Sequence, residues 1–255
     1  MHFGGRRRQM ICILLCAGYA TRLYPLTQNF PKPLLKVGDK TIVDHILCDL
    51  EDIPQITGYV IISNHKFIDH FKKWESEQAY KKPITILDDG STDNDNRLGA
   101  VNDIKFAVKS LNITQDVLVV AGDNVLDFSL KSFVEFAMNK NAPCVMCSEE
   151  NDPQKQRKTA IITRAGDGLI TSYEEKPKEP KGNLAVPPFY YYRAQDVAMI
   201  DSATTEGCNT DAPGSFAAWI STKTPTYALT IPGKRYDIGD MASYELAQKI
   251  FKKQL

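Results

Sequence analysis

The sequence lacks net charge, long apolar runs and the spacing of a common metal motif. Its 255 residues carry 31 Lys and Arg against 31 Asp and Glu, so the formal net charge is zero. This balance argues against a general nucleic-acid binder, and no apolar stretch approaches the roughly 20 residues of a membrane span. We therefore expect no nucleic-acid partner and no membrane partner. The length and the 43% hydrophobic composition suffice for the core of an enzyme domain.

Six cysteines and four histidines form no predicted zinc site. Cys144 and Cys147 stand three apart in a strand-like run, which places them on opposite faces, and the histidines are scattered. Cys12 and Cys16 share one face of the first predicted strand. Buried free thiols are favoured over metal ligands, and free thiols are typical of a reducing compartment. We expect a cytoplasmic protein.

The N-terminus has two interpretations. Arg6, Arg7 and Arg8 followed by "MICILLCAGYA" imitate a secretory signal peptide. We favour a disordered basic leader over residues 1–9 followed by a buried strand, because the residues just downstream depend on that strand for their position. Residues 10–255 are expected to form a single domain. Near residue 150 the sequence pattern changes from alternating strands and helices to one richer in strands. This change divides the domain into halves at 10–150 and 151–255.

In the first half, apolar strand-like runs alternate with helical patterns. Strands are expected over residues 10–16, 59–63, 84–87, 116–121 and 143–147, and helices over 41–52, 65–79, 100–110 and 129–140. Thr41 with Asp44 three residues later predicts a capping box. The alternation predicts a doubly wound, Rossmann-like α/β fold, whose ligand site lies at the carboxyl ends of the strands.

The second half is richer in strands. Residues 159–163 and 169–173 flank "RAGDG" and predict a hairpin, while 189–192 and "TYALTI" predict two further strands. "APGSFAAWI" predicts a short helix, and 241–253 a closing amphipathic helix. We expect this β-rich half to fold onto the first sheet and to give a mixed central sheet.

The stretch "LLCAGYATRLYPL" predicts a phosphate-binding turn. Gly18 follows an apolar strand, where backbone N–H groups can approach a phosphate. Neither G-x-G-x-x-G nor the G-K-[ST] of a Walker loop is present. Arg22 offers a planar guanidinium for phosphate oxygens, and Lys32, between Pro31 and Pro33, offers a stiffly placed ammonium. Two cations beside a glycine turn suit a triphosphate.

The acidic segment "DDGSTDNDN", residues 88–96, does not match a calcium loop. Counting from Asp88 or Asp89 puts Gly99 or Ala100 where the bidentate Glu should be. Two interpretations remain, a solvated loop or a loop that lines the active-site cleft after a central strand.

The longer run "AGYATRLYPLTQNFPKPLL" resembles the signature of the sugar-1-phosphate nucleotidyltransferases, G-x-G-T-R-[LM]-x-P-[LIV]-T-x-x-x-P-K-P. One fixed position differs, because Ala20 stands where the second glycine is expected, and its methyl should slightly restrict backbone approach to a nucleotide. The resemblance is to the short, glucose-1-phosphate thymidylyltransferase-like form. It implies a nucleotide-binding half at 10–150 and a sugar-phosphate half at 151–255.

Three later motifs agree with this resemblance and follow in the family's order. "VVAGDNVLDF" resembles the segment with the metal-binding aspartate, here Asp123. "YEEKP" resembles the E-K-P motif, in which Glu175 would face the sugar hydroxyls and Lys176 the sugar phosphate. "YDIGD" resembles the late D-[IT]-G motif, in which Asp237 would share Mg²⁺ with Asp123.

The resemblance implies a reaction and a set of site residues. An oxygen of a sugar 1-phosphate would attack the α-phosphorus of a nucleoside triphosphate, and pyrophosphate would leave. Because the nucleophile is already anionic, the protein must mainly hold two polyanions together and neutralise charge. The catalytic residues would be Arg22, Lys32 and Asp123, and the nucleotide-binding residues Ala17, Gly18, Thr21, Arg22, Leu98 and Gly99.

Several alternatives stay open at this point. "RLGAV" is the nearest match to the family's base-reading element, and "GDN" favours thymidylyl or cytidylyl over uridylyl transfer. The acceptor could instead be a phosphorylated alcohol or amine such as phosphocholine, although "EEKP" favours a sugar. A non-catalytic relative is disfavoured because the charged residues are all present. Homo-oligomer formation is left open.

Overall fold

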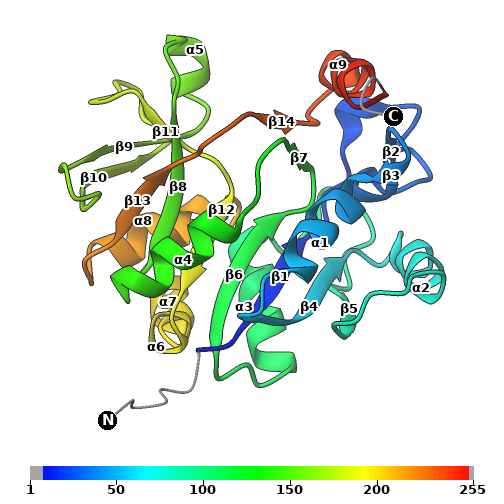
Figure 1. Cartoon of the computed structure of the whole chain (residues 1–255), viewed down its shortest axis with the longest axis horizontal. Coiled ribbons are helices and arrows are strands. Elements are labelled where there is room, and N and C mark those ends of the chain that lie inside the picture. The colour runs from blue at the N-terminus through cyan, green and yellow to red at the C-terminus, as the bar shows by residue number, and fades with distance from the viewer. Residues whose placement is uncertain (1–7, 253–255) are drawn as a thin grey trace.

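The computed structural model describes residues 8–252, and its centre is one ten-stranded sheet (Figure 1). The strands lie in the order β10-β9-β11-β8-β12-β6-β1-β4-β5, with β13 paired to β8. Residues 1–7 of the predicted leader lie outside the described residues. The strands are β1 Met10–Leu15, β4 Ile56–Ser63, β5 Ile84–Asp88, β6 Asp116–Ala121, β8 Cys144–Glu149, β9 Ala160–Arg164, β10 Ile170–Glu175, β11 Leu184–Val186, β12 Phe189–Tyr192 and β13 Tyr227–Thr230.

The first-half strands β6, β1, β4 and β5 are mutually parallel. Their carboxyl ends therefore meet at one edge of the sheet, as the doubly wound pattern predicts. The second half adds antiparallel strands, since β12 runs against both β6 and β8 and the β9–β10 pair forms the predicted hairpin. The mixed central sheet is thereby confirmed. Both halves of the chain contribute strands to it.

Helices cover both faces of the sheet. One face packs against α1 (Ile42–Glu51), α2 (Ile68–Ser76) and α4 (Lys131–Lys140). The other face packs against α3 (Ala100–Ser110), α6 (Ala194–Val197), α7 (Ile200–Thr205) and α8 (Gly214–Ser221). α5 (Pro153–Gln156) is a single short turn of helix with no buried residue.

Alternation along the strands assigns side chains to these two layers. In β1, Cys12 faces the α1 layer and Ile13 the α3 layer. Cys16 shares the face of Cys12, and Cys144 and Cys147 face opposite layers, so both predictions for the cysteine faces are confirmed. All six cysteines are free thiols.

The predicted capping box starts α1. The Thr41 hydroxyl accepts from Asp44 N at 3.1 Å, and an Asp44 carboxylate oxygen accepts from Thr41 N at 3.2 Å. Two predicted boundaries differ in the next elements. β4 begins at Ile56 rather than at residue 59, and α2 spans Ile68–Ser76 rather than 65–79. Asn64 causes the later start, because its side chain accepts from Phe67 N in a turn that precedes the helix.

A small ribbon lies outside the main sheet. β7 (Asn124–Leu126) pairs antiparallel with β14 (Arg235–Asp237), and α9 (Met241–Phe251) follows β14. In Figure 1 the chain after β13 crosses over β7 to reach α9, which packs beside β2 (Lys36–Val37) and β3 (Lys40–Thr41). Leu23, Ile42, Val125, Ile238 and Phe251 share a third apolar cluster there. The ribbon thus brings the late "YDIGD" segment to the end of β6.

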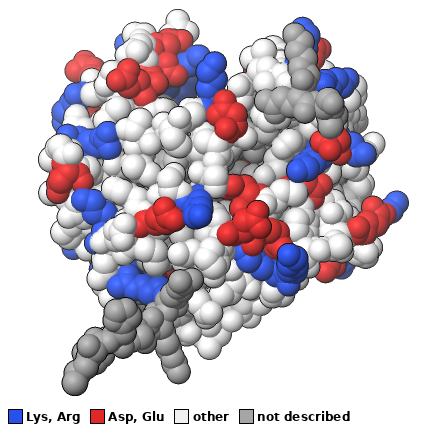
Figure 2. All heavy atoms as spheres, in the orientation of Figure 1, with Lys and Arg blue, Asp and Glu red and all other residues white. Residues whose placement is uncertain are grey.

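Two further features concern the charges on the surface and the length and apolar character of the helices. Figure 2 shows basic and acidic side chains interspersed over one face of the molecule. Within the described residues, no helix combines the length and the apolar character needed to cross a membrane.

Candidate active site

The turn after β1 is held by a buried asparagine from the neighbouring strand end. The Asn64 side chain donates to the Ala17 carbonyl at 2.9 Å and accepts from Phe67 N at 3.0 Å. Gly18 is exposed, and a Cβ built on it would meet nothing within 4 Å. Folding of the turn therefore does not require glycine at this position. Glycine leaves the space above the turn free for close approach of a ligand to the backbone.

Ala20 adopts the left-handed conformation, with φ 48° and ψ 43°. Glycine is the residue that normally occupies this region, because a Cβ there approaches the following carbonyl oxygen. The alanine therefore carries backbone strain at the one position where the sequence departs from the family signature. Thr27 supports the turn by donating its hydroxyl hydrogen to the Ala20 carbonyl at 2.8 Å.

Lys32 and Asp123 form an ion pair at the carboxyl end of β6. Lys32 lies in the 3₁₀ turn η2 (Lys32–Leu34), and its Nζ lies 2.7 Å from Asp123 Oδ2. The same Nζ donates to the Ile238 carbonyl at 3.0 Å. Burial opposes ionisation of Asp123, but the Lys32 ammonium and Arg235 outweigh it and hold the pKa of Asp123 below its ordinary value.

Asp237 lies beside this pair at the end of the β14 ribbon. It is in register with Asn124, the residue after Asp123, and Ile238 N donates to the Asp123 carbonyl at 3.0 Å. Burial and then the negative charge of Asp123 raise the pKa of Asp237. Arg22 also reaches this region, since a Cβ on Gly239 would lie 3.8 Å from both Arg22 Nη2 and Asp237 Oδ1.

A cavity of about 150 Å³ borders the Gly18 turn and extends to Asp89, which follows β5, and we name it the β5 pocket. Its lining comes from the turn after β1, the segment after β5, the start of α3 and the 209–212 segment. These residues are Leu15, Ala17, Gly18, Asp89, Arg97, Gly99, Ala100, Asp103 and Asp211.

Two carboxyl groups in the β5 pocket are incompletely hydrogen-bonded. Asp103 is 6% exposed, and neither its Oδ1 nor Asp89 Oδ2 has a hydrogen-bond partner among residues 8–252. Burial and then the charge of Asp89 raise the pKa of Asp103 to about 7. The Arg97 guanidinium lies 2.8 Å from Asp211 Oδ1 at the same cavity. The pocket therefore combines two buried acceptors with one cation.

A second cavity, of about 360 Å³, is formed by second-half residues, and we name it the Glu175 pocket. Glu175 Oε2 and Ser215 Oγ are buried without a hydrogen-bond partner in the described part of the chain. Burial raises the pKa of Glu175, against the opposing charge of Lys176. The lining residues are Glu175, Lys176, Cys208, Asn209, Ala212, Ser215, Ala218 and Trp219.

The 209–212 segment separates the two cavities. Asn209 and Ala212 line the Glu175 pocket, whereas Asp211 lines the β5 pocket. The carbonyls of Thr210 and Asp211 accept from Val101 N and Ala100 N at the start of α3, at 3.0 and 3.2 Å. Gly99 has φ +88°, and an added Cβ would lie 2.6 Å from the Thr210 carbonyl oxygen. Glycine is therefore required for this contact between the halves of the chain.

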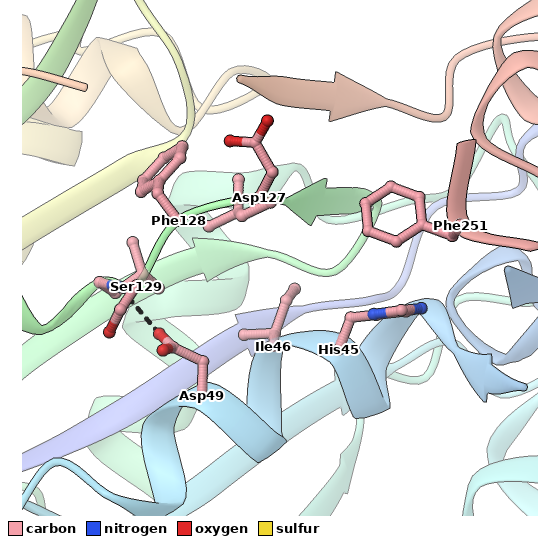
Figure 3. A pocket seen from close by; sticks show the side chains of 9 residues that line it. His45, Ile46, Asp49, Asp127, Phe128, Ser129 and Phe251 are labelled. Carbon is pink, nitrogen blue, oxygen red and sulfur yellow. Dashed lines mark hydrogen bonds between the residues drawn. The ribbon is translucent and has the colours of Figure 1, made fainter. Parts of the chain in front are cut away.

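A third cavity lies away from these groups, between α1, β7 and α9 (Figure 3). Its volume is about 360 Å³, and Leu130 N closes one end by donating to Asp49 Oδ2 at 2.8 Å. Figure 3 shows side chains of α1 facing Asp127, Phe128 and Phe251 across it. None of the nine lining residues is a predicted site residue.

The structure gathers the predicted site residues into three places. Ala17, Gly18 and Gly99 line the β5 pocket, and Glu175 and Lys176 line the Glu175 pocket. The charged residues Arg22, Lys32, Asp123 and Asp237 meet at the end of β6. Thr21 and Leu98 are exposed and line neither cavity.

Sequence reasoning missed the polar residues of the β5 pocket. It left open whether the 88–96 segment is a solvated loop or lines a cleft, and Asp89 of this segment does line the cavity. The signal for Asp103 is present in the sequence, because it falls on the apolar face of α3 with Ala100 and Ala107 three and four residues away. A carboxyl group on the core-facing side of a helix is rare without a partner.

Comparison with known proteins identifies related sequences and structures. A family model described as nucleotidyl transferase matches residues 11–254. A Sulfolobus acidocaldarius protein provisionally named mannose-1-phosphate guanyltransferase is 29% identical over 192 residues, 74% of this chain and 50% of that protein. The bifunctional protein GlmU of Methanococcus aeolicus is 31% identical over 177 residues, 69% of this chain and 38% of that protein.

A solved structure confirms the fold. UDP-glucose pyrophosphorylase in complex with UDP-glucose superposes with a TM-score of 0.81 at 18% identity, covering 97% of this chain and 100% of that one. The sequence relatives are longer. The chain spans about half the length, or less, of the first curated relatives that it matches.

Proposed function

Because the chain belongs to the nucleotidyl transferase family, we propose that it transfers a nucleotidyl group from a nucleoside triphosphate to a sugar 1-phosphate. The products are a nucleoside-diphosphate sugar and pyrophosphate. Half 10–150 binds the nucleotide, and half 151–255 binds the sugar phosphate.

The order of the strands is the observation that carries this proposal. In the sheet, β6 lies between β1–β4–β5, whose ends border the β5 pocket, and the second-half strands that include β10. β10 ends at Glu175 of the other pocket, and Asp123 follows β6 between them. A donor and an acceptor bound in the two cavities would therefore present their phosphates toward the end of β6.

The charged residues at this position suit phosphoryl chemistry. The turn at Gly18 cradles the triphosphate, and Arg22 and Lys32 balance its negative charge. Lys176, exposed at the mouth of the Glu175 pocket, balances the phosphate of the acceptor. An acceptor oxygen attacks the α-phosphorus, the bond to the β-phosphate oxygen breaks, and pyrophosphate leaves with the bonding electrons. Catalysis then rests on orientation and charge neutralisation.

The donor set at the end of β6 fits Mg²⁺. Within residues 8–252, no group of three or more His, Cys, Asp or Glu side chains could hold a metal ion by itself. Asp123 and Asp237 supply two hard carboxylate ligands, and Mg²⁺ commonly takes one or two carboxylates together with water and substrate phosphates. When bound, the ion would neutralise charge on the phosphates. With the ion bound, Lys32 would pair with the triphosphate in place of Asp123.

The Glu175 pocket favours a sugar over phosphocholine as the acceptor. Two of its lining residues carry buried acceptors, Glu175 Oε2 and Ser215 Oγ, that are unpartnered within the described chain. Sugar hydroxyls can donate to both of these oxygens. A trimethylammonium group offers no N–H or O–H donor and would leave them unsatisfied.

The names of the relatives do not decide the base, since guanyl-, adenylyl- and uridylyltransferases are among them. The test is an incubation with each of the common triphosphates, Mg²⁺ and a panel of phosphorylated acceptors, with pyrophosphate release as the readout. We expect release with a sugar 1-phosphate and none with phosphocholine. Release with phosphocholine as the only active acceptor would overturn the sugar assignment. No release with any pair of triphosphate and acceptor would overturn the proposed function.

A further inference from the structure

The β5 pocket holds two buried carboxyl oxygens whose hydrogen-bonding capacity is unused. Asp103 Oδ1 and Asp89 Oδ2 find no partner among residues 8–252, and both residues line the cavity. A buried polar atom without a partner costs free energy, so such atoms usually have a partner outside the chain, either an ordered water or a ligand. Asp89 also accepts from Ser91 N and Ser91 Oγ, each at 2.7 Å, which fixes its side chain.

The position of this pocket matches the nucleoside end of the donor, and this step rests on the proposed function. Along the carboxyl edge the strand ends follow the order β6, β1, β4, β5. The Lys32–Asp123 pair lies at β6, Gly18 follows β1, and the β5 pocket lies on the far side of Gly18. A triphosphate that crosses Gly18 toward Asp123 therefore places its base in the β5 pocket.

The hydrogen-bonding edges of the bases differ in how they meet two acceptors. Guanine carries adjacent N1–H and N2–H₂ donors on one edge and the O6 and N7 acceptors on another. Uracil and thymine offer one N3–H between two carbonyl oxygens, which would face the carboxylates. Adenine and cytosine offer a single amino group beside a ring-nitrogen acceptor.

We infer that Asp89 and Asp103 select guanine as the base of the nucleotide that this chain binds. The two carboxylates accept from N1–H and N2–H₂. Arg97, held by Asp211 at the same cavity, is available to donate to O6 or N7, the pairing that arginine makes with guanine elsewhere. This specificity differs from the thymidylyl or cytidylyl preference that "GDN" indicates.

The first experiment needs no variant. Binding of GTP, ITP, ATP, CTP, UTP and dTTP to the full chain is measured by calorimetry with Mg²⁺ at about pH 8, where Asp103, whose pKa burial raises to about 7, is mostly ionised. ITP is the sharpest probe, because hypoxanthine keeps N1–H, O6 and N7 and lacks only the 2-amino group. A hydrogen bond to a charged group contributes about 10- to 150-fold in affinity, so GTP should bind at least about 10-fold tighter than ITP and tighter still than UTP or dTTP.

Variants then test the two carboxyl groups. Asp103→Asn and Asp89→Asn should each weaken GTP by about 10-fold or more without weakening UTP, because an amide is neutral, keeps one acceptor oxygen and presents N–H donors in place of the other. Asp95→Asn is the matched control, since Asp95 is exposed in the same acidic segment. It should leave all affinities unchanged.

The inference is overturned if ITP or a pyrimidine triphosphate binds as tightly as GTP, or if both variants keep the wild-type ratio of GTP to UTP affinity. Its failure is distinguishable from failure of the proposed function. Pyrophosphate release from UTP or dTTP but not from GTP would remove the guanine assignment and keep the reaction. Selective GTP binding without transfer to any acceptor would keep the assignment and remove the reaction.

Discussion

Replacing Ala20 by glycine should stabilise the protein. Ala20 has φ 48° and ψ 43°, a conformation that costs a residue with a Cβ about 1–2 kcal/mol. Glycine removes this strain but gives the unfolded chain more conformational freedom, which costs about 0.4–1 kcal/mol. The net gain in the free energy of unfolding is therefore about 0.8 kcal/mol when the middle of each range is taken. The supporting bond from Thr27 goes to the Ala20 carbonyl and is unaffected.

The assay is a thermal or urea unfolding curve of the wild type and the Ala20→Gly variant. For a domain of this size, about 1 kcal/mol moves Tm by about 2–4 °C, so we expect Tm to rise by about 1–4 °C. Ala242→Gly is the matched control. Ala242 is exposed in the first turn of α9, and the same substitution in a helix should lower stability by up to about 1 kcal/mol.

The opposite signs of the two variants separate the local conformation from a general effect of glycine. A fall in Tm for Ala20→Gly comparable to that of Ala242→Gly would refute the strain argument. It would show that a Cβ at position 20 costs the folded turn less than glycine costs through the unfolded chain.

Other substitutions test the charges of the site. Asp123→Asn keeps the side-chain shape but removes an anionic ligand, so kcat should fall by at least ~10²-fold, and a near-normal rate would refute the metal assignment. Lys176→Met should raise KM for the sugar 1-phosphate by about 10- to 150-fold, whereas Lys32→Met should raise KM for the triphosphate and lower kcat; weakening of the same substrate by both would contradict the two half-sites. The raised pKa of Asp103, about 7 against about 3.9 when unfolded, favours the folded state below pH 4, and this stabilisation disappears as the pH rises to 7. Asp103→Asn should abolish this loss, at most about 4 kcal/mol, and parallel urea-midpoint curves against pH for the two proteins would disprove it.

Local signals predicted the elements that depend on local chemistry. The Thr41–Asp44 capping box and the helix over 100–110 occur as predicted, because capping bonds and a 3.6-residue apolar period are encoded within one turn or one face. The strand at 189–192 also matches, since an unbroken run of Phe and Tyr with all four side chains buried favours a central strand.

Two of the missed elements depend on distant partners. β7 and β14 have three residues each, too few for a periodic signal, and they form because Asn124 and Asp237 meet across more than a hundred residues of chain. The ion pair of Lys32 with Asp123 has the same origin, because the sequence indicates each charge but not its partner. The family motifs indicated residues such as Gly18 and Glu175 that border the two cavities, whereas the arrangement of these cavities on either side of 209–212 required the fold.

The fate of a labelled phosphate tests the proposed reaction most directly. The full chain is incubated with Mg²⁺, a sugar 1-phosphate and a triphosphate labelled at the α-phosphorus, and the products are separated. We predict that the label enters a nucleoside-diphosphate sugar, that one pyrophosphate is released per sugar nucleotide formed, and that Asp123→Asn prevents both. Label recovered only in a free nucleoside mono- or diphosphate, with inorganic phosphate in place of pyrophosphate, would contradict nucleotidyl transfer.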